Sequence, residues 1–401
     1  MTALDREQWH RITPHLDRAL DLIPGEREAW LAALRKADAS LATDVDDALT
    51  AHCALDRERF LEREAPSAAA PRACAGDRVG AYTLVEPIGQ GGTANVWRAV
   101  RSDGRFEGQA AVKLLSANPV GPAGSERLRQ EASMLARLTH PHIVRLADAG
   151  TTTSGQPYLV LEHVEGRQID HYCDERGLGV DARLRLFVDV LSAVAHVHAH
   201  HIVHADLKPS NLLVTNDGEV KLLDFGAAIW LDGGSGSRRS TPVRDASTGF
   251  TPMFAAPEQT SGGPVTTAAD VYGLGMLLYR LLSGHHPGGS GGLDVTRSSD
   301  ALVDEPRRMS SVVADRREAF QVLEQHAARR STTPDALRRR LRGDLDAIAA
   351  KALRKRPHDR YVSVMAYAED VRRSLEGQPV QAQPGAFHSR LRQFIRPLRP
   401  R

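Results

Sequence analysis

The chain has 401 residues, of which 41% are hydrophobic and 25% charged, and this composition excludes a wholly disordered, collagen-like or disulfide-stapled protein. Its 52 basic and 50 acidic residues nearly cancel, so the overall charge does not favour nucleic acid as a partner. Three scattered cysteines form no CxxC pair, no apolar stretch is long enough to span a membrane, and no signal sequence opens the chain. We therefore expect a soluble, cytoplasmic protein.

Residues 1–63 are predicted to form a small all-α module, because apolar residues such as Trp9, Ile12, Leu16 and Leu20 recur at helical spacing. Residues 64–78 are rich in Ala and Pro without periodicity and are interpreted as a linker. The module has no catalytic constellation. It either binds an unidentified partner or packs as an appendage on the domain that follows.

The next segments change from strands to helices. Alternation places Tyr82, Leu84, Glu86 and Ile88 on one face of a strand, a glycine cluster follows, and residues 96–100 and 110–115 form two further strands. Residues 125–138 and 181–200 are predicted to be helical, as is nearly every periodic segment after residue 265. A β-rich part followed by an α-rich part indicates an α+β fold with two unlike lobes.

The glycine cluster is suited to phosphate binding, because glycine lets backbone N–H groups approach phosphate oxygens. Its residues are Ile88, Gly89, Gln90, Gly91, Gly92, Thr93, Ala94, Asn95 and Val96. By itself the cluster is equally compatible with a hairpin turn. The chain continues as a strand instead of opening a helix, which argues against a dinucleotide fold, and no Gly-Lys-Ser/Thr ending marks a P-loop.

Lys113 lies in the otherwise apolar strand 110–115, where an ammonium group needs an anionic partner. Glu131 in the following helix is the candidate, although its neighbours also fit a solvated helix face. Only six lysines occur among the 52 basic residues, so each retained lysine is notable.

A second set of polar residues follows two apolar strands near residues 202–226. Asp206, Lys208 and Asn211 lie in one loop, and Asp224 ends the second strand. In-line phosphoryl transfer needs a carboxylate to orient the attacking hydroxyl, an ammonium near the moving phosphoryl group and oxygen ligands for Mg²⁺. The spacing therefore predicts phosphoryl transfer.

The ordered set of a Gly-rich loop, a strand lysine, a helix glutamate, HxDxKxxN, Asp224-Phe225-Gly226 and Ala256-Pro257-Glu258 resembles the protein kinase superfamily over residues 79–376. The segment Asp206-Leu207-Lys208-Pro209-Ser210-Asn211, with Thr251-Pro252, is similar to the serine/threonine branch. Gly343-Asp344-Leu345-Asp346-Ala347-Ile348 and Arg360-Tyr361 resemble bacterial Hanks-type kinases.

This resemblance implies a two-lobed fold with a β-rich small lobe at 79–162 and a helical large lobe at 163–376. Residues 377–401 follow as a basic tail. It implies transfer of the ATP γ-phosphoryl group to Ser or Thr hydroxyls of protein substrates in bacterial signalling, autophosphorylation, and Mg²⁺, with Mn²⁺ as an alternative, as the metal.

The resemblance also assigns roles to individual residues. Residues 88–96 would cover the ATP phosphates, Lys113 would hold the α and β phosphates while pairing with Glu131, and the backbone of Glu162 and Val164 would meet adenine. Asp206 would be the catalytic base, Lys208 would contact the γ-phosphate, and Asn211 and Asp224 would bind the metal. The structural positions are His204, Phe225, Gly226, Thr251, Glu258, Asp270 and Arg360. Glu258 would pair with Arg360, and Asp270 would anchor the catalytic loop.

Two positions depart from the family pattern. Ala94 replaces the third glycine of the loop, which is expected to tune nucleotide affinity. Ala205 replaces the arginine before the catalytic aspartate, which usually pairs with a phosphorylated activation loop. We therefore hypothesise that activity does not require activation-loop phosphorylation, although autophosphorylation of the Ser and Thr residues between Asp224 and Glu258 remains expected.

Other functions and partners stay open at this stage. One alternative is a pseudokinase scaffold that binds nucleotide and partners without turnover, and another is a small-molecule phosphotransferase, against which Ala256-Pro257-Glu258 argues. Five histidines between His196 and His204 are interpreted as a solvated helix end and not as a metal site. The basic tail after Phe387 either contacts an anionic membrane or, as we favour, is solvated or docked on the core. The oligomeric state is not predicted.

Overall fold

The computed structural model describes residues 34–35, Asp38, 41–42, 73–90, 94–115, 122–231, Thr251, 253–287, 306–315 and 320–382. The chain divides into two compact units, Met1–Arg72 and Ala73–Arg401. Nearly all of the predicted all-α module, most of the predicted linker and most of the basic tail lie outside the described residues, so their predictions stay predictions.

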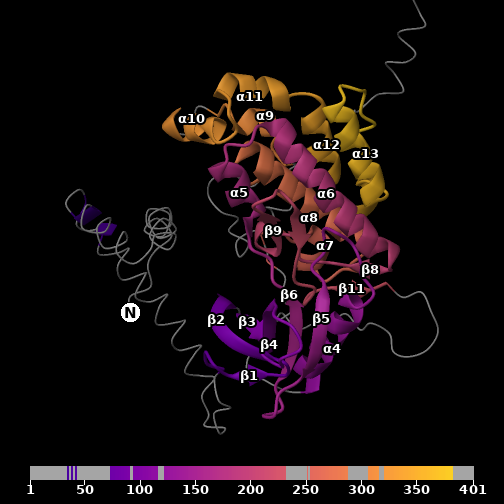
Figure 1. Ribbon diagram of the computed structural model, residues 1–401. Helices are drawn as coiled ribbons and strands as arrows, with labels where there is room; N and C mark the ends of the chain where they lie inside the picture. The colour runs from indigo at the N-terminus through magenta and orange to yellow at the C-terminus, as the bar shows by residue number, and fades with distance from the viewer. Residues whose placement is uncertain are drawn as a thin grey trace, which may run out of the picture. The chain divides into compact units, whose positions relative to one another are not determined.

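The second unit begins with an antiparallel sheet in the order β1-β2-β3-β4-β6-β5 (Figure 1). The strands are β1 (Arg78–Val79), β2 (Tyr82–Gln90), β3 (Ala94–Arg101), β4 (Gln109–Leu115), β5 (Leu146–Thr151) and β6 (Pro157–Glu162). Helix α4 (Pro122–Leu135) packs on strands β5 and β6. We call β1–β6 with α4 the small lobe.

The sheet has two different buried faces because successive side chains of a strand point to opposite sides. On β4, Ala110, Val112 and Leu114 join a cluster on one face with Leu84 and Tyr158. The residues between them, Ala111 and Lys113, face α4 and the helical lobe, where Ala111 joins the main core. The alternation therefore directs the only charged side chain of β4 toward the rest of the second unit.

Sequence alternation on β2 holds only for its first half. Tyr82 and Leu84 are buried as expected, but Glu86 is exposed and Ile88 is 48% exposed. The pairing of β2 with β3 shifts register between Leu84 and Glu86 and again between Pro87 and Gly89. Each shift changes the face of the sheet toward which the following side chains point. Ile88 therefore points away from the core.

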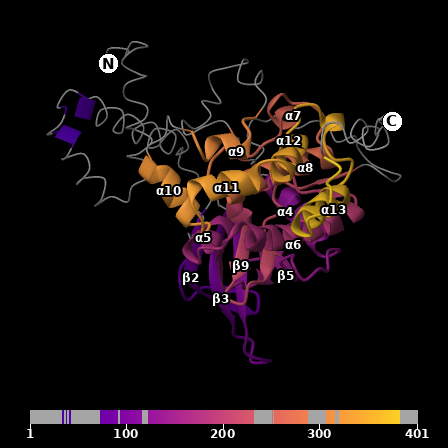
Figure 2. The same ribbon diagram turned by 90° about the horizontal axis from the view of Figure 1, so that it is seen from above.

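The remaining described residues of the second unit form a mainly helical lobe, as Figures 1 and 2 show, and we call it the large lobe. Its helices are α5 (Ile169–Glu175), α6 (Val180–Ala199), η1 (Pro209–Asn211), α7 (Pro257–Thr260), α8 (Thr267–Ser283), α9 (Met309–Val312), α10 (Phe320–Ala328), α11 (Pro334–Leu341), α12 (Asp344–Ala352), η2 (Pro357–Asp359) and α13 (Val364–Leu375). Its short strands are β7 (Gly166–Gln168), β8 (Ile202–Val203), β9 (Leu212–Thr215), β10 (Val220–Leu222) and β11 (Ile229–Trp230).

Helices α6 and α8 form the centre of the large lobe. Between them they bury residues such as Phe187, Leu191, Leu274 and Leu278, all essentially inaccessible to solvent. Helix α8 starts where the Thr266 hydroxyl accepts the N–H of Ala268 and ends at Gly284, whose φ of +82° suits glycine. None of the described helices is long and apolar enough to cross a membrane.

Candidate active site

Lys113 lies between two carboxylates that come from different lobes. Its Nζ is 2.7 and 2.9 Å from the two carboxylate oxygens of Glu131 on α4, and 2.7 Å from Oδ1 of Asp224, which follows β10. Lys113 is 9% and Glu131 3% exposed, so of the two readings left open for Glu131 the ion pair is the one formed. The site thus joins the sheet, α4 and the large lobe through one ammonium group.

Burial and charge act in opposite directions on these groups. Burial would lower the pKa of Lys113, but the two carboxylates outweigh it and raise that pKa above its usual range. Burial raises the pKa of Glu131, and Lys113 opposes that rise. For Asp224 the same ammonium outweighs burial and lowers the pKa. Lys113 is therefore held charged at neutral pH.

Asp224 begins a tight turn that needs glycine two positions later. The backbone φ of Asp224 is +47°, and its Oδ1 accepts the N–H of Gly226 at 3.2 Å. A Cβ atom at Gly226 would lie 3.2 Å from Asp224 Oδ1 and 3.6 Å from Lys113 Nζ. Glycine at this position is explained by that close approach.

The loop between β8 and η1 brings the second set of polar side chains together around Asp206, which is 7% exposed. Its Oδ2 is 2.7 Å from Lys208 Nζ and accepts Asn211 Nδ2 at 3.1 Å, while its Oδ1 accepts the N–H of Thr251 at 3.0 Å. Lys208 also donates to the Thr251 hydroxyl at 2.6 Å. The carboxylate is therefore held at both oxygens by fixed donors.

Asp270, at the start of α8, anchors this loop from beneath. Its two oxygens accept the N–H groups of His204 (2.9 Å) and Ala205 (2.8 Å), and Oδ2 is 2.7 Å from His198 Nε2. Burial would raise the pKa of Asp270, but these contacts, led by that of His198, lower it. The His204 ring packs edge-on against Phe225 at 4.9 Å between centroids. Ala205 has a φ of +63°, so the anchored loop keeps this alanine in the left-handed backbone conformation, which is sterically unfavourable for a residue with a Cβ atom.

A buried ion pair joins Glu258 of α7 to Arg360. Arg360 donates to both oxygens of Glu258, at 2.6 and 2.7 Å, and to the carbonyls of Arg354, Lys355 and Ala268. Both side chains are less than a tenth exposed. All the donors of this guanidinium fork have acceptors, which is the arrangement a buried charge requires.

The predicted phosphate-binding loop is described at its two ends. Gly89 and Gln90 end β2, and Ala94, Asn95 and Val96 begin β3. The residues at its tip, Gly91, Gly92 and Thr93, lie outside the described residues. Val96 pairs in register with Lys113 on β4, so the loop is attached to the strand that carries the ammonium.

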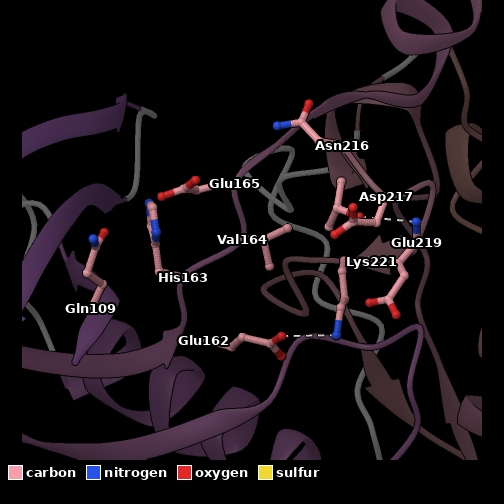
Figure 3. A pocket seen from close by; sticks show the side chains of 10 residues that line it. Gln109, Glu162, His163, Val164, Glu165, Asn216, Asp217, Glu219 and Lys221 are labelled. Carbon is pink, nitrogen blue, oxygen red and sulfur yellow. Dashed lines mark hydrogen bonds and ion pairs between the residues drawn. The ribbon is translucent and has the colours of Figure 1, made fainter. Parts of the chain in front are cut away.

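Glu162 and Val164 lie where β6 leads into the large lobe. The N–H of Glu162 donates to Arg145 O at 2.9 Å, and its carboxylate is 3.0 Å from Lys221 Nζ. A cavity of about 410 Å³ adjoins this segment (Figure 3). Its lining residues are Gln109, Glu162, His163, Val164, Glu165, Thr215, Asn216, Asp217, Glu219 and Lys221. The lining includes Glu162 and Val164, the residues predicted to meet adenine, but not Lys113, Asp206 or Asn211.

Two functional contacts were missed by sequence reasoning. Gln259 accepts the N–H of Ala256 and donates to the carbonyl of Ala205 at 2.8 Å, which ties α7 to the loop of Asp206. Its position, three residues after the N-cap Ala256 of a helix that starts with Pro257, is the available sequence signal. The pairing of Lys221 with Glu162 had no such signal, because 59 positions separate the two residues.

The family model for the protein kinase domain matches residues 82–369, which contain all of the groups described above. The chain belongs to the protein kinase family. A probable serine/threonine-protein kinase of Streptomyces coelicolor is 34% identical over 76% of this kinase chain and 41% of its own length. PksC of the same organism is 32% identical over 79% of this chain and 53% of its own length. PknB of Mycobacterium tuberculosis is 31% identical over 75% of this chain and 44% of its own length. The chain thus spans about half the length of these relatives or less.

The kinase fold is also found in solved structures. The kinase domain of PknI from Mycobacterium tuberculosis matches with a TM-score of 0.53 and 24% identity, covering 76% of this chain and all of that domain. This match confirms the fold predicted from sequence for the two lobes, a curled β-sheet followed by a helical lobe.

Proposed function

We propose that this kinase transfers the γ-phosphoryl group of ATP to Ser or Thr hydroxyls of protein substrates and of itself. The observation that carries the proposal is the paired set of contacts in which Lys113 joins Glu131 to Asp224 while Asp206 holds Lys208. The names of the relatives, all serine/threonine-protein kinases, support the same acceptor class. We propose bacterial signalling as its context and the cytoplasm as its location.

In this proposal Asp206 orients the attacking hydroxyl and takes its proton. The hydroxyl oxygen bonds to the γ-phosphorus as the bond to the leaving oxygen of ADP breaks, and Lys208 balances the charge on the transferred group. Fixed donors hold Asp206 and Lys208 in place before substrate arrives, which is the preorganisation that such catalysis needs. Lys113, kept in line by Glu131, would bind the α and β phosphates. The backbone of residues 88–96 would cover the phosphates, and that of Glu162 and Val164 would bind adenine.

The side chains of Asn211 and Asp224 fit a divalent metal. Asn211 donates from Nδ2 to Asp206, so the carbonyl oxygen of its amide would serve as a metal ligand, and Asp224 has a second oxygen beyond the one at Lys113. The two residues are neighbours, because Asn211 O accepts the N–H of Leu223 at 2.8 Å. Hard oxygen donors suit Mg²⁺ or Mn²⁺, which would neutralise phosphate charge.

We further propose that activation-loop phosphorylation is not required for activity. Ala205 offers no cation for a phosphate, and the end of the loop is already held, because Thr251 donates its N–H to Asp206 and Gln259 donates to Ala205 O. Phosphatase treatment should change peptide phosphorylation less than about twofold. A drop of more than about tenfold would defeat this proposal.

The test of the main proposal is incorporation of phosphate from ATP with Mg²⁺, read by intact mass and phosphosite mapping on the chain itself and on a generic basic protein. We expect phosphoserine or phosphothreonine in the wild type and none in Asp206→Ala. Nucleotide binding without incorporation in the wild type would instead favour the scaffold function.

A further inference from the structure

Four histidines from two distant parts of the sequence lie in one row where the small lobe meets the large lobe. Successive ring centroids are 5.4 Å apart from His142 to His140, 5.1 Å from His140 to His196 and 4.5 Å from His196 to His200. His140 and His142 precede β5, and His196 and His200 lie at the end of α6. We call these four residues the histidine row. The sequence prediction of solvated imidazoles at this helix end is wrong for His204, which is fully buried, and for His198, which contacts Asp270. His196 and His200 are half-buried, and only His201 is exposed.

The row fastens the segment between α4 and β5 to the large lobe. The N–H of Val144 donates to Leu222 O at 3.0 Å, and the N–H of Leu222 donates to His142 O at 2.8 Å. His140 Nε2 contacts the Ser192 hydroxyl of α6 at 3.2 Å. Because α4 carries Glu131 and ends just before this segment, the row lies at the base of the helix that holds the partner of Lys113.

The surroundings of the row disfavour positive charge at its centre. Burial, then His196 and His142, lower the pKa of His140, and burial, then His200, lower the pKa of His196. Nε2 of His196 is buried and has no hydrogen-bond partner among the described residues. The packed arrangement therefore favours the neutral form of the two central rings.

Among the described residues, Asp189 is the carboxylate that contacts the row, and it lies at the His142 end. Asp189 Oδ1 is 3.6 Å from His142 Nε2, and burial raises the pKa of Asp189 against the effect of His142. The other ring nitrogens in contact with protein groups meet uncharged partners, as His142 Nδ1 does with Val220 O at 3.1 Å and His200 Nδ1 with His196 O at 2.9 Å. The charges acting on His140 and His196 thus come from other imidazoles, so protons there would repel one another.

We propose that the histidine row is a proton-sensitive clamp, whose neutral rings hold the segment 139–144 against α6 and whose protonation releases that segment and the base of α4.

The direction of the pH effect follows from the linkage between protonation of the histidines and opening of the clamp. His140 and His196 have pKa values below the ordinary 6.5, so the closed clamp binds fewer protons than the open one. The closed clamp is therefore most stable relative to the open one above pH 6.5. This stabilisation is lost as the pH falls through 6.5 toward the lowered pKa values of His140 and His196. Release of α4 would loosen the pairing of Glu131 with Lys113, so phosphoryl transfer would decline on acidification. Only that last consequence rests on the proposed function.

The test is hydrogen exchange of the full chain, followed by mass spectrometry at about pH 7.5 and 5.5 and corrected for the intrinsic rate at each pH. The reporters are the amides of Ile143 and Val144, which are hydrogen-bonded to His140 O and Leu222 O. We expect their exchange to rise about fivefold at the lower pH in the wild type. His196→Phe keeps a ring and removes both nitrogens. In this variant the exchange of the same two amides should rise less than about twofold between about pH 7.5 and 5.5.

His358→Gln is the matched control, because this histidine has a side chain 74% exposed and lies outside the row, and it should behave as the wild type. His200→Gln, which removes the ring that acts on His196, provides a second test should His196→Phe fail to fold. An absent rise in the wild type, or an equal rise in the row variants, would overturn the clamp. Exchange needs no catalysis, so a chain that opens on acidification yet transfers no phosphate would refute only the proposed function.

Discussion

At the scale of single residues, Lys113 shows why lysine is kept in a chain whose basic residues are nearly all arginine. Its compact ammonium group meets Glu131 and Asp224 within 2.9 Å, in a space that a planar guanidinium does not match. We expect Lys113→Arg to lower phosphoryl transfer by about 10²-fold or more, measured as kcat/KM with a peptide substrate.

The control for this substitution is Lys351→Arg on α12, where the ammonium lies 4.4 Å from the centre of the Tyr361 ring. Arginine keeps that cation–π contact, so activity should stay within about twofold of the wild type. Equal losses in both variants would show that the lysine geometry at residue 113 is not what matters.

Two cysteines give a second prediction at this scale. Cys173 is fully buried, and burial raises its pKa to about 11, whereas Cys74 is exposed. Because the thiolate is the reactive form, a thiol reagent at pH 8 should modify Cys74 and leave Cys173 unmodified until the protein is denatured. Peptide mapping after native labelling measures this, and rapid native modification of Cys173 would contradict the burial of α5.

Single residues were also where the sequence was most informative. The candidates Lys113, Glu131, Asp206 and Asp224 belong to short motifs, and the structure brings them into two linked contact sets. The contact of Lys208 with Thr251 spans 43 positions and could not be read from local spacing. The roles given to these side chains stay predictions until turnover is measured.

At the scale of elements, the pair of Glu258 and Arg360 joins α7 to the turn before α13. Arg360→Met would leave a buried carboxylate and three carbonyls without their donor. We expect a loss of about 3–5 kcal/mol in the free energy of unfolding, measured by urea denaturation.

A second ion pair on α13 supplies the comparison. Arg373 and Glu369 are four residues apart and 33% and 48% exposed, so water already solvates both charges. Arg373→Met should cost at most about 0.5 kcal/mol. If the two arginine variants lost similar stability, burial would not be the reason for the strength of the Glu258 pair.

Elements were predicted well where their periodicity was long and less well where tertiary contacts decide. The helix expected at 181–200 is α6 at Val180–Ala199, and the strand expected at 110–115 is β4 at Gln109–Leu115. The register shifts of β2 turn Ile88 outward. The second shift lies between Pro87 and Gly89, residues typical of strand irregularities, which the alternation pattern did not take into account. The histidine row joins His140 to His196, 56 positions further along the chain, so its half-burial depends on how the lobes meet.

At the scale of the whole molecule, all of the described site residues belong to the unit Ala73–Arg401. A chain of residues 73–401 should therefore fold alone and keep its turnover within about threefold of the full chain. Circular dichroism and a peptide phosphorylation assay measure both properties. An unfolded or inactive product would show that residues 1–72 are needed for folding or catalysis.

The outer face of the small-lobe sheet has a core of its own, in which Leu84, Val112, Leu114 and Val160 pack apart from the main cluster. A core so small contributes little cooperativity, so heating should melt this face of the sheet as a separate foldon before the main core, to which α4 and the other face of the sheet belong. Nucleotide would bind across both lobes and couple the two transitions by mass action. Calorimetry should then record two heat-absorption peaks without ATP and a single, later peak with it.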